Sequence, residues 1–247
     1  MKQLGLIGFP LGHSRSPELF QQFFSRDGAQ GWEYRLFPME QVGGLRAWIR
    51  YQPELRGLNV TIPHKEAVIP QLDELDDTAR QTGAVNCIKI IRTPELYLIG
   101  YNTDVLGFAQ MLDEHLHGRK IKALVLGTGG ASKAVQYVLR NREIPFKTVS
   151  RYRGKADVVY EEVDANMVQE HHLIIHTSPL GMQGDYEGMA PDLPYWHLSS
   201  EHICLDLVYN PERTPFMELS ALRDARVENG LRMLRAQAEA AWEIFRV

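Results

Sequence analysis

Cysteine is scarce in this chain of 247 residues, which contains only Cys87 and Cys204. No C-x-x-C pair occurs, so neither a disulfide framework nor a cysteine-rich zinc site is expected. Two isolated cysteines are more typical of buried free thiols in a reducing compartment. We therefore expect a cytoplasmic protein.

The chain also lacks a strong excess of one charge and any long apolar run. Lys and Arg number 27 against 31 Asp and Glu, a net charge of −4 without a long basic stretch, so a nucleic-acid-binding surface is not expected. No apolar run approaches the roughly 18 residues that span a bilayer. The apolar stretch over residues 4–11 is interrupted by Gly5, Gly8 and Pro10, which argues against a signal peptide. We expect neither a nucleic-acid nor a membrane partner.

Two common catalytic motifs are missing as well. The G-x-S-x-G segment of serine hydrolases does not occur, and residues 12–16 do not match it. The nine histidines include no H-E-x-x-H pattern, so no metal ligands are assigned.

What is present is an ordinary globular composition, 44% hydrophobic and 23% charged. Short apolar runs alternate with helical patterns, which predicts an α/β fold with largely parallel sheets. Strands are expected over residues 4–9, 32–37, 58–62, 86–91, 96–101, 120–126, 146–150, 172–176 and 203–208. Helices are expected over residues 40–51, 64–81, 104–116, 131–142 and 229–246, and one more begins with Ser16 as N-cap and Pro17 as its first residue. A domain boundary is placed near residue 104.

A glycine-rich turn follows the strand over residues 120–126. With the next helix and strand it forms a βαβ unit, the context that a dinucleotide-binding fingerprint requires. Gly127 permits the tight turn, and Gly129 lets backbone amides approach a pyrophosphate. Ser132 stands where the third fingerprint glycine would fall. A tight turn without a ligand remains the alternative.

The residues after the second strand of this unit indicate which dinucleotide is bound. An NAD site usually carries an acidic residue there. This chain instead has Ser150-Arg151-Tyr152-Arg153, followed by Lys155. Such cations favour a 2′-phosphate and hence NADP. A solvated basic loop is the other interpretation.

Polar residues also gather beside predicted strand ends in the first 104 residues. Two hydroxyls, Ser14 and Ser16, follow the first strand, although Ser16 could serve as a helix cap alone. Asn59 and Thr61 share one face of a strand, and Lys65 comes just after that strand. The segments GAVN and GYNTD continue the pattern. α/β proteins form their sites at such strand ends.

Taken together, these segments resemble the shikimate dehydrogenase family. The matching stretches, which run in order from residue 13 to residue 238, are HSRSP, GLNVTIPHK, GAVNC, GYNTD, GTGGAS, TSPLGM, DLVYNP and GLRMLRAQA. The resemblance implies NADPH-dependent reduction of 3-dehydroshikimate to shikimate, in the biosynthesis of chorismate and the aromatic amino acids. It also implies two domains. The substrate-binding and catalytic domain would comprise residues 1–104 and the helix 232–247, which packs back on that domain. The NADP-binding Rossmann domain would comprise residues 105–231.

The resemblance assigns roles residue by residue. Lys65 and Asp104 match the catalytic pair of the family. Substrate contacts are implied for Ser14, Ser16, Thr61, Asn86, Tyr209 and Gln237. Cofactor contacts are implied for Asp77, Gly127, Thr128, Gly129, Gly130, Ala131, Ser150, Arg151, Leu207 and Gly230.

Specificity and assembly are less constrained. Ser150-Arg151-Tyr152 departs from the Asn-Arg-Thr of many members, which leaves the preference for NADP open. A quinate/shikimate dehydrogenase with relaxed substrate or NAD use is the enzyme alternative, but an acidic residue after the second strand would favour it and this chain has none there. A non-catalytic dinucleotide-binding sensor is the alternative from another class, although both Lys65 and Asp104 are retained. A monomer or a homodimer is compatible with the sequence.

Overall fold

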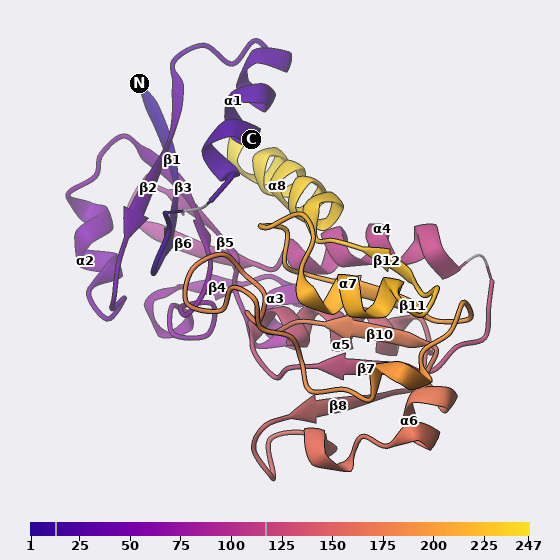
Figure 1. Ribbon diagram of the computed structural model, residues 1–247. Helices are drawn as coiled ribbons and strands as arrows, with labels where there is room; N and C mark the ends of the chain where they lie inside the picture. The colour runs from indigo at the N-terminus through magenta and orange to yellow at the C-terminus, as the bar shows by residue number, and fades with distance from the viewer. Residues whose placement is uncertain (13, 117) are drawn as a thin grey trace. The chain divides into compact units, whose positions relative to one another are not determined.

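The computed structural model describes residues 1–12, 14–116 and 118–247, so His13 of the HSRSP segment and His117 lie outside the described residues. The chain forms two compact units, one made of Met1–Leu106 with Arg235–Val247 and the other of Gly107–Leu234. Each unit is built around its own six-stranded sheet (Figure 1). The divisions fall inside helices α4 (Asp104–Leu116) and α8 (Leu231–Arg246), which therefore each contribute residues to both units.

The first unit has a mixed sheet in the order β2-β1-β3-β5-β6-β4. Its strands are β1 (Lys2–Gly8), β2 (Trp32–Pro38), β3 (Leu55–Val60), β4 (Glu74–Leu75), β5 (Cys87–Ile91) and β6 (Tyr97–Tyr101). Its short helical elements are α1 (Ser16–Arg26), α2 (Leu45–Arg50), the 3-10 turn η1 (Ile69–Gln71) and α3 (Asp77–Thr82). The β2-β1-β3 and β4-β6 pairs are parallel, whereas β5 runs antiparallel to both β3 and β6. The sheet is therefore mainly parallel, as expected.

The second unit has a parallel sheet in the order β12-β11-β10-β7-β8-β9. Its strands are β7 (Ala123–Leu126), β8 (Phe146–Ser150), β9 (Val158–Val159), β10 (Leu173–His176), β11 (Ile203–Asp206) and β12 (Arg226–Glu228). Its other elements are α5 (Gly130–Asn141), η2 (Tyr160–Glu162), α6 (Ala165–Glu170), η3 (Tyr195–His197) and α7 (Pro215–Ala221). Read from β9, this is the 3-2-1-4-5-6 strand order of the Rossmann fold, which confirms the predicted fold class. The order reverses between β7 and β10, where such sheets bind their ligands.

Most predicted strands and helices are confirmed, but three local predictions are wrong. The segment over residues 64–81 is not one helix, since it is divided into η1, β4 and α3. The helix expected over residues 40–51 begins only at Leu45, after Gly43 and Gly44. Ser16 is not an N-cap: it is the first residue of α1, and Arg15 occupies the cap position without capping the helix through its side chain.

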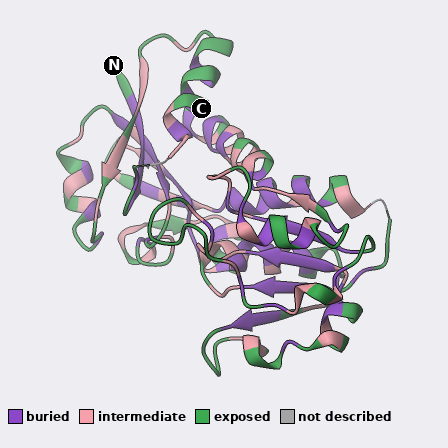
Figure 2. Cartoon of the chain, in the orientation of Figure 1, coloured by how far each residue is buried: buried purple, intermediate pink, exposed green. Residues whose placement is uncertain are grey.

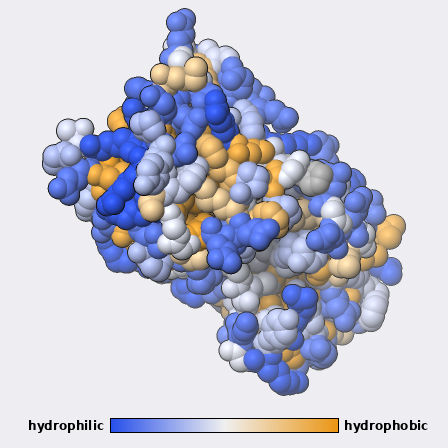
Figure 3. Space-filling view, turned by 90° about the vertical axis from the view of Figure 1, so that its left-hand side faces the viewer, coloured by the Kyte–Doolittle hydropathy of each residue, from blue (hydrophilic) through white to orange (hydrophobic). Residues whose placement is uncertain are grey.

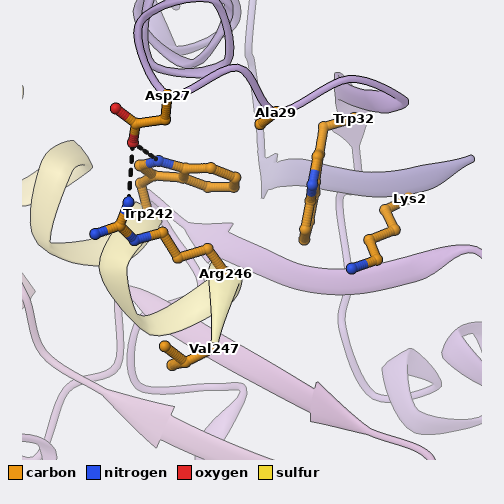
Figure 4. A pocket seen from close by; sticks show the side chains of 7 residues that line it. All are labelled: Lys2, Asp27, Ala29, Trp32, Trp242, Arg246 and Val247. Atoms are coloured by element: carbon orange, nitrogen blue, oxygen red, sulfur yellow. Dashed lines mark hydrogen bonds and ion pairs between the residues drawn. The ribbon is translucent and has the colours of Figure 1, made fainter.

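The C-terminal helix α8 packs on the first unit through one apolar face, as expected. Ala238, Ala241, Trp242 and Phe245 recur at helical spacing and are buried with Phe20, Phe23 and Leu4. Trp242 Nε1 also donates to Asp27 Oδ2 over 2.7 Å, and Arg246 donates to the same oxygen (Figure 4). These contacts hold the helix, and with it Gln237, against α1 and the sheet.

The strands at the centre of the second sheet are buried on both faces, as helix-covered parallel strands are (Figure 2). Both cysteines lie in strands, and both are buried and free. On the face shown in Figure 3, hydrophilic residues surround smaller groups of hydrophobic ones. Within the described residues, no helix has the length and apolar character needed to cross a membrane.

Candidate functional site

An ion pair between Lys65 and Asp104 lies at the centre of the polar residues of the first unit. Lys65 Nζ is 2.5 Å from Asp104 Oδ2, and the two side chains are 15% and 7% exposed. Lys65 follows β3, and Asp104 is the first residue of α4. The Lys65 carbonyl accepts a bond from Val85 N, which fixes the backbone next to the segment containing Asn86. The structure thus brings together the two residues predicted to form a catalytic pair, with the lysine side chain still partly exposed.

Asn86 connects this pair to two other residues. Its Nδ2 donates to Asp104 Oδ1 and Thr103 Oγ1 at 2.9 Å each and lies 3.2 Å from Gln237 Oε1. Its Oδ1 accepts from Thr103 N over 2.7 Å. Asn86 is 2% exposed, so its amide is held rigidly by these partners. Gln237, which comes from α8, is therefore in hydrogen-bond contact with the predicted substrate-binding Asn86.

Thr103 is a residue of this cluster that the sequence motifs do not identify. It is 2% exposed, and its hydroxyl approaches both Asn86 Oδ1 and Gln237 Oε1. The GYNTD segment contains this threonine directly before Asp104, so the signal was present in the motif. The motif does not show that the Thr103 hydroxyl lies next to the side-chain amides of Asn86 and Gln237.

The loop after β1 contains the two predicted serines. Ser14 N donates to Leu11 O, and Ser14 Oγ accepts from Ser16 N over 3.3 Å. Ser16 is buried, although it does not cap the helix. A Cβ on Gly8 would lie 2.4 Å from Thr61 Cγ2 and 3.0 Å from Leu11 Cδ2. Gly8 is therefore required for the close approach of Thr61 to the start of this loop.

Asn59, which the sequence predicts to share a strand face with Thr61, contacts Tyr34 and the Asn86 backbone. Its Oδ1 accepts from Tyr34 Oη over 2.9 Å, and its Nδ2 lies 3.4 Å from Asn86 O. Asp77 lies apart from these contacts at the start of α3, where it is 83% exposed and pairs with Arg80. Among the contacts of the described residues, none joins Asp77 to the Lys65–Asp104 pair.

In the second unit, the glycine turn between β7 and α5 has the form that a pyrophosphate requires. Gly127 has φ +124, and a Cβ there would lie 2.6 Å from Thr177 Oγ1, so only glycine fits. Gly129 is the N-cap of α5 and provides no side-chain bond to the helix amides, which stay available to an anion. A Cβ on Gly129 would meet nothing within 4 Å, so the space beside the turn is open.

Ser132 explains how the turn closes without the third fingerprint glycine. It is fully buried, and its Oγ donates to Gly127 O over 2.7 Å. Gln136 in turn donates to Ser132 Oγ. The serine therefore ties the first turn of α5 to the end of β7, next to Thr128, Gly130 and Ala131.

The end of β8 carries the predicted 2′-phosphate residues. Ser150 Oγ accepts from Tyr152 N over 3.1 Å. The guanidinium of Arg151 and the ammonium of Lys155 lie 5.6 Å and 5.3 Å from the centre of the Tyr152 ring. Arg153 pairs with Glu162 instead. Arg151 and Lys155 thus form a cationic group that can bind a phosphate.

An acidic residue, Asp157, is bonded to β8 itself. Asp157 Oδ2 accepts from Thr148 N and Thr148 Oγ1 at 2.7 and 2.8 Å. The bond from the Thr148 amide is the main cause that lowers the pKa of Asp157 below its ordinary value. Asp157 therefore braces β8 and is not placed as a ribose ligand.

Leu207 and Gly230, two of the residues predicted to contact the cofactor, are in contact with each other. A Cβ on Gly230 would lie 2.3 Å from Leu207 O, so the two backbones meet only because residue 230 is glycine. Gly230 N also donates to Val208 O. Tyr209 belongs to this second unit. Within the described residues, no group of three or more His, Cys, Asp and Glu is placed to hold a metal ion.

The chain is similar to known proteins along nearly its whole length. The sequence model of the shikimate dehydrogenase substrate binding domain matches residues 6–88. The shikimate dehydrogenase (NADP(+)) of Carboxydothermus hydrogenoformans is 35% identical and covers 98% of this chain and 90% of its own length. That of Geobacillus kaustophilus is 37% identical, with 98% and 91% covered.

Solved structures show the same similarity. Shikimate 5-dehydrogenase from Thermus thermophilus, in complex with NADP(H) and shikimate, has a TM-score of 0.87 at 27% identity and covers 100% of this chain and 94% of its own. Quinate dehydrogenase from Corynebacterium glutamicum, in complex with NAD, has a TM-score of 0.83 at 26% identity, with 99% and 93% covered.

Proposed function

Because this chain belongs to the shikimate dehydrogenase family, we propose that it catalyses the reversible reduction of 3-dehydroshikimate to shikimate with NADPH. This reaction serves the biosynthesis of chorismate and the aromatic amino acids. The observation that carries the proposal is the Lys65–Asp104 pair and its bond to Asn86. A binding module without catalysis would not need a lysine and a carboxylate held together in a partly buried polar cluster.

We assign the two compact units different tasks. The unit Met1–Leu106 with Arg235–Val247 holds the substrate and the catalytic pair. The unit Gly107–Leu234, with its Rossmann strand order, holds NADP. The glycine turn and the cationic end of β8 support this assignment.

Lys65 manages the proton of the reaction. Reduction places negative charge on the carbonyl oxygen, which an ammonium within hydrogen-bond reach stabilises. Lys65 Nζ then gives its proton to that oxygen, and in the oxidative direction the neutral amine takes it back. Asp104 Oδ2 accepts from Nζ over 2.5 Å and so holds the Lys65 side chain in position.

The substrate carboxylate is bound by neutral donors in this proposal. Ser14 and Ser16 bind it with help from Tyr209, while Thr61, Asn86 and Gln237 bond the ring hydroxyls or the carboxylate. Hydroxyl and amide groups donate without carrying a charge that must be desolvated. The bonds that already orient Asn86 and Gln237 reduce the entropy lost on binding.

The residues of the second unit fit NADP. Gly127, Thr128, Gly129, Gly130 and Ala131 would hold the pyrophosphate at the start of α5. Ser150 and Arg151 would bind the adenosine phosphate, and Leu207 and Gly230 would line the nicotinamide, with Asp77 as a further contact. When bound, NADPH supplies the hydride that reduces the carbonyl carbon.

A quinate dehydrogenase is the second candidate, since one similar structure is a quinate dehydrogenase in complex with NAD. The test is oxidation of shikimate and of quinate, each with NADP⁺ and NAD⁺, followed by nicotinamide absorbance. Turnover with shikimate and NADP⁺ alone supports the proposal. Preference for quinate or NAD⁺ would replace the specificity assignment, and no turnover by folded protein that binds NADPH would favour a sensor.

We further propose a cytoplasmic enzyme that acts as a monomer or homodimer, with a small-molecule substrate and no nucleic-acid or membrane partner. The two buried free thiols support a reducing compartment. Size-exclusion chromatography with light scattering distinguishes the two oligomeric states.

A further inference from the structure

A buried histidine at the end of β10 connects an aspartate to a serine. His176 Nδ1 is 3.0 Å from Asp206 Oδ1, and His176 Nε2 is 2.6 Å from Ser178 Oγ. The side chains of His176 and Asp206 are both 0% exposed. The proposed reaction uses none of these three residues, so their arrangement requires its own explanation.

The partners of Asp206 determine the direction of these bonds. Asp206 Oδ1 also accepts from Val208 N over 2.9 Å, and Oδ2 accepts from Thr214 Oγ1 over 2.5 Å. A carboxylate that accepts on both oxygens takes the His176 Nδ1 hydrogen as a further donor. In a neutral imidazole, Nε2 is then an acceptor, and the Ser178 hydroxyl must donate to it. Ser178 Oγ keeps only lone pairs for other partners.

The same residue types form the Ser-His-Asp triad of hydrolases, but the burial here argues against that chemistry. In a hydrolase, the histidine passes the serine proton to a leaving group, so Nε2 must be reachable by substrate. His176 has no exposed surface. Asp206 and His176 therefore orient the Ser178 hydroxyl and do not activate it as a nucleophile.

Ser178 lies directly beside the glycine turn of the dinucleotide site. An ideal Cβ on Gly127 would lie 3.4 Å from Ser178 N. Thr177, the residue before it, donates through both N and Oγ1 to Leu126 O at the end of β7. The loop after β10 is thus fastened to the strand that leads into the turn.

The sheet order indicates which half of a dinucleotide would meet this loop. β8, which ends at Ser150 directly before Arg151, flanks β7 on one side, and β10 flanks it on the other. A dinucleotide centred on the turn with its adenosine half over β8 extends its nicotinamide half toward β10. Ser178 is therefore on the nicotinamide side.

We propose that Asp206 and His176 are positioning residues that fix the Ser178 hydroxyl as a hydrogen-bond acceptor for a donor group on the nicotinamide nucleoside half of NADP. Phosphate oxygens only accept, so a serine polarised in this way does not bind the pyrophosphate; it binds a ribose hydroxyl or a carboxamide N–H. This inference rests on the proposed function, since it assigns a subsite within the same dinucleotide site.

The test compares the affinity for NADP⁺ with that for adenosine 2′,5′-bisphosphate, which lacks the nicotinamide nucleoside, by calorimetry at pH 7.5. We expect Ser178→Ala to weaken NADP⁺ binding by about two- to tenfold, the range of one neutral hydrogen bond, and to leave the bisphosphate unaffected. His176→Asn should produce the same selective loss. The double variant should lose no more than either single variant, because the two residues act through one bond.

His202→Asn is the matched control for loss of a buried histidine. His202 is 2% exposed and bonds Val168 O and Ser199 in the same unit. It should leave both affinities unchanged. The ¹⁵N NMR spectrum of the wild type should contain a signal from an imidazole with a protonated Nδ1 and a bare Nε2 that disappears in His176→Asn. His171, whose Nδ1 donates to Met167 O, gives a signal of the same kind that should persist in the variant.

The outcomes separate this inference from the proposed function. Wild-type protein that does not bind NADP⁺ overturns both. Wild-type protein that binds NADP⁺ while Ser178→Ala binds it equally well overturns the inference alone. Three other results would also overturn the inference alone. These are additive losses of NADP⁺ affinity in the double variant, an equal loss of affinity for adenosine 2′,5′-bisphosphate in Ser178→Ala, and a His176 ring that carries hydrogens on both nitrogens.

Discussion

Replacing Lys65 by methionine should reduce both turnover and stability, for two separable reasons. The methionine keeps most of the aliphatic stem but removes the ammonium. Loss of a general acid–base group typically lowers turnover by about 10²–10⁴-fold, which corresponds to about 2.7–5.4 kcal/mol in the activation barrier. The expected loss is measured as kcat for shikimate oxidation at saturating NADP⁺.

The stability effect comes from the partner that is left behind. Asp104 is 7% exposed and keeps only its bond from Asn86 Nδ2 among the described partners of its carboxylate. Breaking a fully buried pair costs about 3–5 kcal/mol. Because Lys65 is 15% exposed, we expect a smaller loss in the free energy of unfolding here, about 2–3 kcal/mol. Denaturant unfolding measures this loss.

Adding Asp104→Asn to Lys65→Met separates the two effects. The neutral amide removes the unpaired charge, so most of the lost stability should return while turnover stays low. Lys122→Met is the matched control, because Lys122 pairs with Glu170 at the surface and is 51% exposed. It should cost less than about 1 kcal/mol and no activity. Full turnover by Lys65→Met, or recovery of turnover together with stability in the double variant, would refute the assigned proton transfer.

Three further predictions concern packing, pH and cofactor choice. A Cβ on Gly57 would lie 2.2 Å from Phe245 Cδ1, so Gly57→Ala should cost about 1–3 kcal/mol in thermal unfolding, whereas Gly43→Ala, with nothing within 4 Å, should cost far less. Burial lowers the pKa of His202 below its ordinary 6.5. The neutral ring therefore contributes stability that is fully present above about pH 6.5 and is lost as the pH falls toward the pKa of the folded state. The midpoint of unfolding should decline from pH 7.5 to 5.5, and it should decline less steeply in His202→Asn. Arg151→Ala should raise the KM for NADP⁺ at least about tenfold, the range of a charge-assisted bond, and leave the KM for NAD⁺ unchanged. Arg153→Ala, which removes a residue paired with Glu162, should have a smaller effect. Equal changes for both cofactors would contradict the assignment of Arg151 to the 2′-phosphate.

Local sequence signals predicted well those elements whose ends are set by their own residues. Asp104 begins α4, and β8 ends at Ser150, both as expected. The apolar spacing of α8 correctly identified its buried face at Ala238, Ala241 and Trp242. In each case the signal is an amphipathic period or an end signal within the segment itself.

The segment over residues 64–81 shows where such signals fail. Asp76 Oδ1 accepts from Ala79 N and so starts α3 in the middle of the expected helix. Just before it, Glu74 and Leu75 pair in parallel with β6. That strand exists because of a partner more than twenty residues away, which no pattern within the segment can reveal.

The candidate site was likewise only partly determined by the sequence. The motifs alone identified the family and nearly all of the polar residues that the structure describes around Lys65 and around the glycine turn. Tertiary structure decided which of them touch: Gln237 meets Asn86 from 151 positions away because α8 packs against the sheet. It also showed that His176 joins Asp206 to Ser178, since adjacent strands β10 and β11 place their ends side by side. Spacing along a chain fixes residue type and local conformation, whereas a hydrogen bond depends on distances that only strand pairing and helix packing set.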